Sequence, residues 1–289
     1  MSGRKIEIAI DKSLCVRCNK CVRVCPSQIF TAAAEGIELV NTESCIGCGH
    51  CVCVCGSGAL LHSLFPREKI HKIDYSLYPS AGQFMLLCKG RRSNRAFSTA
   101  PVPDDSLRMI LEASHAAPTA SNMQQVEFTV IKDPKMIRKI SGFVVDLFGH
   151  YVKLLENPLL KPFLKLFFKK YYRYVPVYYR MKREMEQGRD MVLRGAVAVI
   201  FIHTPSGSMF GEADGNLAYQ NGSLMAESLG VSQLYTGFVC TAIKMGKGKF
   251  EKMINLPPDR KIVAGMGLGM PLFRYGSYPE REPLRYVEI

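Results

Sequence analysis

The alternation of apolar and polar residues predicts a chain that mixes short strands with amphipathic helices. Apolar positions alternate with polar ones over residues 6–10 and again over 36–40, as expected for two short strands. Further along, the same patterns predict helices at 84–89, 105–114 and 214–229 and strands at 126–131 and 197–203. We therefore expect an α+β fold.

The periodicity fails between residues 66 and 84, where Pro66 and Pro79 interrupt it. We expect this stretch to link an N-terminal domain of residues 1–65 to a C-terminal domain of residues 85–289. A length of 289 residues suffices for two domains with separate cores. The apolar content of 47% and the charged content of 22% are those of an ordinary globular protein.

Eight of the eleven cysteines fall into two runs of identical spacing. The runs are Cys15-x-x-Cys18-x-x-Cys21-x-x-x-Cys25-Pro26 and Cys45-x-x-Cys48-x-x-Cys51-x-x-x-Cys55. This spacing holds 4Fe-4S clusters in bacterial ferredoxins, where three close thiolates bind one cubane and the fourth binds the other. The repeat predicts two 4Fe-4S clusters in a bacterial-ferredoxin-like domain whose fold depends on the metal.

By the crossover rule, each cluster takes one ligand from the other run. A zinc ribbon or a disulfide framework is the alternative, but zinc sites usually need only two cysteine pairs. We assign the first cluster to Cys15, Cys18, Cys21 and Cys55, and the second to Cys45, Cys48, Cys51 and Cys25.

The second run departs from the ferredoxin pattern at two positions. Gly56 stands where a second proline would be usual, which removes a rigid turn but no ligand. Cys53 lies inside the last spacing, yet only Cys55 keeps the three-residue gap. We interpret Cys53 as a bystander.

Arginines gather in the stretch Arg91-Arg92-Ser93-Asn94-Arg95. Guanidinium groups suit a phosphate or carboxylate, although a charge cluster alone is more often a solvated surface. About 25 residues on follows Ala117-Pro118-Thr119-Ala120-Ser121-Asn122-Met123-Gln124. This pair of motifs resembles the nitroreductase family of FMN-dependent enzymes. The resemblance covers about 85–289, and with the cysteine runs the chain resembles the ferredoxin-nitroreductase fusion proteins of anaerobes.

The resemblance implies an FMN-binding α+β domain with a central mixed sheet, a homodimer and a flavin at the subunit interface. It places the FMN phosphate and the pyrimidine edge of the flavin at Arg91, Arg92, Ser93 and Arg95. It also implies that Asn122 and Gln124 approach the ribityl chain or ring, that the Gly237 amide faces flavin N5, and that Arg281 reaches the phosphate.

Two positions depart from the family pattern. Val197 and Gln125 stand where prolines are common, which affects the substrate side rather than FMN binding. The stretch Gly265-x-Gly267-x-Gly269 lacks the spacing and the following helix of a dinucleotide-binding motif. Without a separate nicotinamide-binding domain, the clusters are the expected electron donors.

Of the net charge of +13, +6 lies in one segment. Residues 151–190 contain ten Lys/Arg against four Asp/Glu, and no nucleic-acid-binding signature accompanies them. They belong to a basic helical insertion at about 143–190, in which Pro162 begins a helix and Pro176 ends it. Apolar and aromatic side chains fall on one face of that helix and lysines on the other.

Three readings of this insertion stay open. The favoured one is a cap that packs over the flavin cleft or the dimer partner; a docking patch for an acidic partner and an in-plane membrane contact are the alternatives. No apolar run approaches the roughly 18 residues of a membrane span, and the first residues lack the core of a signal peptide. Since thiolate ligation of iron also requires a reducing environment, we expect a cytoplasmic protein.

The sequence thus predicts an iron-sulfur flavoprotein oxidoreductase. Electrons from a low-potential donor, ferredoxin or similar, would pass through two 4Fe-4S clusters to FMN, which would reduce a nitroaromatic, quinone or enoyl acceptor. The alternatives are an NAD(P)H-dependent nitro or quinone reductase and a non-catalytic electron-transfer or redox-sensing flavoprotein. No catalytic side chain is assigned, because flavin chemistry does not require one.

Overall fold

The computed structural model describes residues 5–289 and divides the chain into two compact units. The first runs to Tyr78 and also includes Thr119–Gln124. The second comprises Pro79–Pro118 and Gln125–Ile289. The break at Tyr78 lies inside the expected linker, and helix α3 (Ala81–Gly90) begins three residues earlier than predicted because Ser80 and Gln83 form a capping box.

The first unit is built from two similar halves. In the first half, helix α1 (Lys20–Val24) follows the first two cysteines and contains the third, Cys21; in the second, helix α2 (His50–Val54) takes the equivalent place and contains Cys51. Strand β1 (Ile8–Ile10) pairs antiparallel with β4 (Leu60–His62), and β2 (Phe30–Ala33) pairs antiparallel with β3 (Gly36–Leu39). Four 3-10 turns complete its described residues: η1 (Thr42–Ser44), η2 (Arg67–Lys69), η3 (Tyr75–Leu77) and, in the Thr119–Gln124 segment, η4 (Ala120–Asn122).

The core of the first unit is small. It consists of Ile29, Phe30, Ile37, Cys51, Val52 and Leu60, with other cysteines packed around them. So few buried apolar side chains contribute little to stability on their own. This agrees with a fold that depends on what the cysteines bind.

The second unit is organised around a four-stranded sheet. Strand order is β5 (Glu127–Ile131), β6 (Ala198–Pro205), β8 (Arg260–Gly269) and β7 (Ser232–Tyr235). All three strand pairs are antiparallel, so the mixed character expected for this sheet is confined, among the described residues, to one parallel bridge between Ser93 and Gln233.

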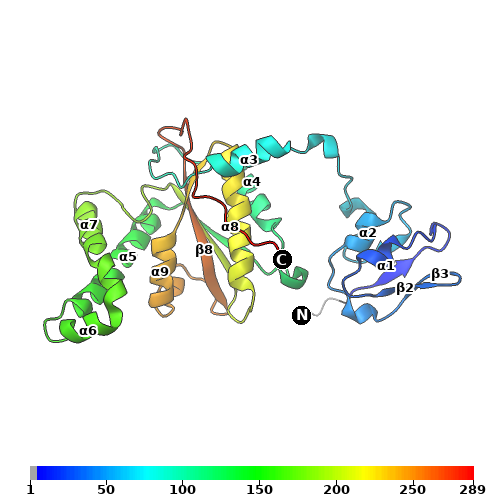
Figure 1. The fold of residues 1–289 in the computed structure, drawn as a ribbon, viewed down its shortest axis with the longest axis horizontal. Helices are drawn as coiled ribbons and strands as arrows, with labels where there is room; N and C mark the ends of the chain where they lie inside the picture. The colour runs from blue at the N-terminus through cyan, green and yellow to red at the C-terminus, as the bar shows by residue number, and fades with distance from the viewer. Residues whose placement is uncertain (1–4) are drawn as a thin grey trace. The chain divides into compact units, whose positions relative to one another are not determined.

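Helices cover both faces of this sheet (Figure 1). Helices α4 (Asp104–His115) and α8 (Gly211–Ser228) share one apolar cluster with β6 and β8. Helices α5 (Pro134–Leu155), α7 (Val175–Glu186), α9 (Gly237–Met245) and α10 (Lys249–Met253) contribute to a second cluster on the other face. The central strand β6 is buried along almost its whole length, as expected for a strand covered on both sides.

Two of the three glycines of β8, Gly265 and Gly269, allow close packing rather than dinucleotide binding. A Cβ atom on Gly265 would lie 2.3 Å from Thr236 Oγ1, and one on Gly269 would lie 2.7 Å from Phe97 Cγ. Only glycine allows these approaches without a shift of the neighbouring atoms. The sequence pattern did not reveal that these residues form a strand.

The basic insertion differs from the prediction in its helix boundaries. Helix α6 (Lys161–Phe168) does begin with Pro162 in its first turn, but it is followed by a 3-10 segment, η5 (Lys169–Tyr174). Pro176 then lies in the first turn of α7, so it starts a helix rather than ending one. In Figure 1, α6 lies at the end of the second unit farthest from its sheet. None of the helices within residues 5–289 is long and apolar enough to cross a membrane.

Candidate functional site

The cysteines of the first unit line two separate hollows. Cys15, Cys18, Cys21 and Cys55 line the first hollow, and Cys25, Cys45, Cys48 and Cys51 line the second. Each hollow thus takes three cysteines from one run and one from the other. These are the two sets that the crossover rule assigns to separate clusters.

The chemistry of these hollows fits a cluster better than a single metal ion or a disulfide. Within residues 5–289, no three His, Cys, Asp or Glu side chains are arranged to hold one metal ion, and all eleven cysteines are free thiols. A zinc ribbon would require four thiolates converging on one point. Each hollow is instead lined by four thiols, the donor set that a 4Fe-4S cluster requires.

Burial acts against thiolate formation at several of these cysteines. It raises the pKa of Cys51 to about 11, and it raises the pKa of Cys21 and of Cys45 in the same direction. Burial also opposes ionisation of Cys55, but hydrogen bonds from Ser57 and from backbone amides outweigh it and lower the pKa of that thiol. Metal ligation at these cysteines must therefore be accompanied by loss of the thiol protons.

Cys53 lines neither hollow. Its side chain is exposed on α2, whereas Cys55 borders the first hollow. The sequence-based choice of Cys55 as the fourth ligand stays a prediction, and this geometry supports it.

The arginine-rich motif forms an extended segment at the edge of the second unit's sheet. Arg91 is the C-cap of α3, and Ser93 forms the parallel bridge to Gln233 in β7. Arg91 and Arg92 are half-buried, and Arg95 is exposed. Within residues 5–289, none of the three arginines forms an ion pair. Unpaired guanidinium groups at a fixed edge are suited to an anion.

Two buried amides hold this segment in place. Asn94 is 4% exposed, and its Nδ2 donates to Ser232 Oγ at 2.9 Å while its backbone N–H donates to the Gln233 carbonyl. Gln233, which is fully buried, accepts from the Tyr219 hydroxyl at 2.6 Å and donates weakly to the Arg92 carbonyl. Burial raises the pKa of Tyr219 to about 12, so this hydroxyl stays a donor. These contacts fix the backbone from which the arginines project.

The turn at Gly237 connects β7 to α9. Thr236, the N-cap, makes no side-chain hydrogen bond to the first turn, and among the described residues no acceptor for the Gly237 amide is found. A helix start with free amide donors favours a partly negative group such as a flavin ring nitrogen or oxygen. The expected role of Gly237 is therefore chemically reasonable.

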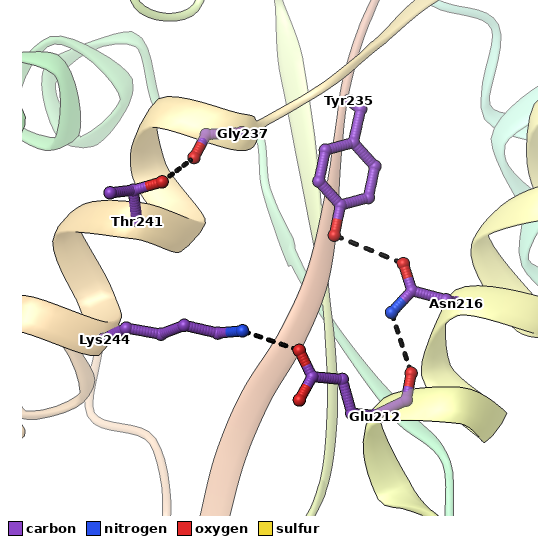
Figure 2. A network of polar contacts seen from close by, with 6 residues as sticks. All are labelled: Glu212, Asn216, Tyr235, Gly237, Thr241 and Lys244. Carbon is purple, nitrogen blue, oxygen red and sulfur yellow. Dashed lines mark hydrogen bonds and ion pairs between the residues drawn. The ribbon is translucent and has the colours of Figure 1, made fainter. Parts of the chain in front are cut away.

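A polar network holds this turn against α8 (Figure 2). The Tyr235 hydroxyl donates to Asn216 Oδ1 at 3.3 Å, and Asn216 Nδ2 donates to the Glu212 carbonyl at 2.7 Å. At the other end of α9, Lys244 pairs with Glu212 at 2.6 Å. Burial raises the pKa of Tyr235 above its usual range, so its hydroxyl remains protonated. These contacts join the end of β7 and the last turn of α9 to α8, and so hold the turn that carries the Gly237 amide.

Asn122 and Gln124 fall in the first unit. The loop Thr119–Gln124 belongs to that unit although the chain on both sides of it belongs to the second. Asn122 Nδ2 donates to the carbonyl of Gly47, which lies within the second cysteine run, at 2.8 Å. Ser121, Asn122 and Gln124 all have positive φ angles, which is unusual for residues other than glycine. Such concentrated backbone strain is typical of functional loops.

Arg281 lies in the exposed tail after β8. Within residues 5–289, no hydrogen bond or ion pair joins it to the arginine segment, so its role stays a prediction.

Arg194 is a residue that the sequence analysis did not assign. Burial, and then the positive charge of Arg95, lower the pKa of its guanidinium. Two neighbouring cations of this kind suggest an anion site. In the sequence, Arg194 is marked only by its position before Gly195, Ala196 and strand β6.

Comparison with known proteins finds a family match for each of the two parts of the chain. Residues 88–270 match the nitroreductase family, and residues 7–56 match a 4Fe-4S dicluster domain. The first match covers most of the chain. The chain belongs to the nitroreductase family.

Individual relatives are distant. An NADPH-dependent oxidoreductase of Staphylococcus saprophyticus is 25% identical over 205 residues, which is 70% of each chain. An FMN reductase (NAD(P)H) of Bacillus subtilis is 26% identical over 188 residues, 65% of this chain and 66% of the relative. A nitroreductase from Desulfitobacterium hafniense, solved with bound FMN, has the same fold: TM-score 0.54, 20% identity, 71% of this chain and 97% of that one.

These findings confirm the predicted combination of a ferredoxin-type module and a nitroreductase-family oxidoreductase domain. They also confirm the α+β fold and agree with the predicted cofactor classes, 4Fe-4S clusters and FMN. The individual ligand and flavin-binding residues remain predictions.

Proposed function

We propose that this nitroreductase-family protein binds two 4Fe-4S clusters and FMN, and that electrons from a low-potential donor pass through the clusters to FMN, which reduces an organic acceptor. The main support is the presence, in one chain, of two cysteine-lined hollows and a nitroreductase-family domain. Bound flavin accepts electrons singly and delivers them in pairs, which is what coupling a one-electron relay to a two-electron acceptor requires.

In this proposal the chain's own residues bind and orient. The two sets of four cysteines hold the clusters, and the backbone fixed by Asn94 and Gln233 directs Arg91, Arg92 and Arg95 toward the phosphate and pyrimidine edge of FMN. The free amide at the start of α9 donates to the flavin ring. No side chain is proposed as an obligatory acid or base.

Further parts of the proposal concern assembly and location. A homodimer with FMN at the subunit interface would follow the family pattern. A reducing compartment such as the cytoplasm suits eight thiolate ligands. Ferredoxin or a similar carrier is the proposed donor, and a nitroaromatic, quinone or enoyl compound is the proposed acceptor class.

A second candidate is direct reduction by NAD(P)H, since relatives are named NADPH-dependent oxidoreductase and FMN reductase (NAD(P)H). Anaerobic stopped-flow spectroscopy of the purified holoprotein distinguishes the two. Reduction of bound FMN by reduced ferredoxin but not by NADH or NADPH supports the cluster route. The reverse result supports the second candidate, and protein that binds no flavin would overturn both.

A further inference from the structure

His62 lies beside one cysteine of the second cluster hollow. It is the last residue of β4, pairs with Ile8 of β1, and is only 4% exposed. Its Nε2 atom lies 3.6 Å from Cys45 Sγ, and its ring lines the hollow formed by Cys25, Cys45, Cys48 and Cys51. A buried imidazole therefore faces a sulfur atom of this site.

The hydrogen bonds of the ring determine which nitrogen carries the proton. The backbone N–H of Leu64 donates to His62 Nδ1 at 3.2 Å. Because Nδ1 accepts this bond, the proton of the neutral ring lies on Nε2. That proton is directed at Cys45 Sγ, so the contact is an N–H···S hydrogen bond with His62 as the donor.

Neighbouring residues hold the ring in this orientation. The Phe65 ring lies 4.9 Å from the His62 ring, centroid to centroid. Phe65 in turn packs on Gly49, where an added Cβ would lie 3.2 Å from the aromatic ring. The donor is thus positioned from two sides, by the Leu64 amide and by Phe65.

Among residues 5–289, no buried side chain donates a hydrogen bond to a sulfur atom of the first hollow. Ala32 stands seven residues after Cys25, just as His62 stands seven residues after Cys55. Arg17, Asn19 and Lys20 also line that hollow, but the side-chain contact to one of its sulfur atoms is that of Ser57, whose hydroxyl lies 3.7 Å from Cys55 Sγ in an exposed setting where water competes. The two halves of the unit are therefore unequal in their hydrogen bonds to sulfur.

We infer that His62, as a positioning residue, donates a hydrogen bond to the Cys45 thiolate and thereby raises the midpoint potential of the cluster that Cys45 binds. One-electron reduction adds a negative charge to a cluster and its thiolates. A donor to sulfur stabilises this more negative state more than the oxidised one, and does so most strongly when it is shielded from water. Removing the donor lowers the potential.

The inference rests on the proposed clusters, and the experiment separates the two claims. Anaerobically purified full-length protein is titrated potentiometrically and followed by EPR, with iron counted for each preparation. If the unaltered protein lacks two cluster signals, the cluster proposal fails. If both signals are present, the variants test His62 alone.

Three variants are compared with the unaltered protein. In His62→Phe, which keeps a ring but has no N–H donor, we expect one of the two midpoint potentials to become more negative and the other to stay. His62→Gln, which keeps a donor, should largely restore the potential. The matched control is His71→Phe, because His71 is an exposed histidine of the same unit and should shift neither potential. Equal potentials in His62→Phe and unaltered protein, or equal shifts of both clusters, would overturn the inference.

A spectroscopic measurement needs no substitution of His62. In pulsed EPR of the reduced protein labelled with ¹⁵N-histidine, a weak nitrogen coupling to one cluster is expected. His50 also borders this hollow, so the coupling should persist in His50→Gln. Loss of the coupling in that variant, or its absence from the unaltered protein, contradicts the assignment to His62.

Discussion

Asn94 Nδ2 donates a hydrogen bond to Ser232 Oγ at 2.9 Å, which joins two residues 138 positions apart. The same side chain accepts, through Oδ1, from the backbone N–H of Ala96 at 2.9 Å. Asn94 therefore attaches the arginine segment to β7 and shapes its backbone at the same time. The geometry of the proposed FMN site depends on a residue that carries no charge.

The first prediction concerns this residue. Asn94→Ala leaves the Ser232 hydroxyl and the Ala96 amide without their partners, which costs roughly 1–3 kcal/mol of stability. FMN affinity should fall as well, because the arginines lose their fixed backbone. Thermal unfolding and fluorescence titration with FMN measure the two effects. Gln220→Ala, at an exposed position on α8, is the control, and equal losses in both variants would contradict the prediction.

The second prediction tests the tail. Arg281→Gln should lower the affinity for FMN by about tenfold, which corresponds to ~1.4 kcal/mol, and leave the affinity for riboflavin unchanged. Riboflavin lacks the phosphate that Arg281 is proposed to contact. Arg285→Gln removes the same charge from an exposed position four residues further on and should change neither affinity. A matching loss for both flavins would show that Arg281 acts on something other than the phosphate.

The third prediction concerns the pH dependence of stability. His203 in β6 is 4% exposed, and burial lowers its pKa below the usual 6.5. Its Nε2 atom contacts Thr129 Oγ1 at 3.1 Å, and within the described chain its Nδ1 has no partner. Between the folded pKa and about 6.5, the unfolded chain binds more protons than the folded one, so stability falls as pH drops through this window.

Substitution of His203 should make this slope shallower. One proton contributes at most about 1.4 kcal/mol per pH unit. His203→Gln should therefore unfold at a temperature that depends less on pH between 7.5 and 5.5, when followed by circular dichroism. His115→Gln, at an exposed position, should keep the original slope. An unchanged slope in His203→Gln would mean that the imidazole is protonated equally in both states.

Some of this architecture was predictable from sequence because the signal is local. The cysteine spacing is such a signal, because each run spans only eleven residues. In the structure, the two assigned sets of thiols line separate hollows. Strand β6 and helix α4 were predicted to within two residues for the same reason. Their periodic apolar positions specify a buried face without reference to the rest of the chain.

Other features depend on distant partners and gave no local signal. Strand β8 contains three glycines, which are poor strand formers, and is a strand because β6 and β7 flank it. From the sequence alone, Asn94 is a polar residue of a loop. Its burial depends on its contact with Ser232 in β7, which is distant in the sequence. Pro176 is compatible with either end of a helix. Only the structure, in which the 3-10 segment η5 ends just before it, shows that Pro176 lies at the start of α7.

The fourth prediction concerns the basic insertion. Leu166 is 76% exposed and Phe163 is 62% exposed, so the second unit itself covers neither of these apolar side chains of α6. Exposed apolar patches of this kind mark contact surfaces. We expect a second copy of the chain to cover it, and Leu166→Glu to weaken the homodimer in analytical ultracentrifugation. Lys170→Glu, in the same segment, changes charge without removing apolar surface and should have the smaller effect.

The same segment allows the membrane alternative to be tested. We expect no co-sedimentation of the unaltered protein with liposomes containing anionic lipid, at low or at moderate salt. Binding at low salt that is lost in Leu166→Glu would instead support an in-plane membrane contact. A dimer that is as stable in Leu166→Glu as in the unaltered protein would exclude the partner copy as the cover.

The fifth prediction separates two cysteines that lie two residues apart. Cys55 lines the first hollow with Cys15, Cys18 and Cys21, whereas Cys53 is exposed and lines neither. Cys55→Ala should therefore reduce the iron content of anaerobically purified protein by about one cluster, because a cubane in that hollow loses its fourth thiolate. Cys53→Ala should retain the full iron content, and it serves as the matched control. If loss of Cys53 costs a cluster while loss of Cys55 does not, the crossover assignment is wrong, and with it the division of ligands between the two hollows.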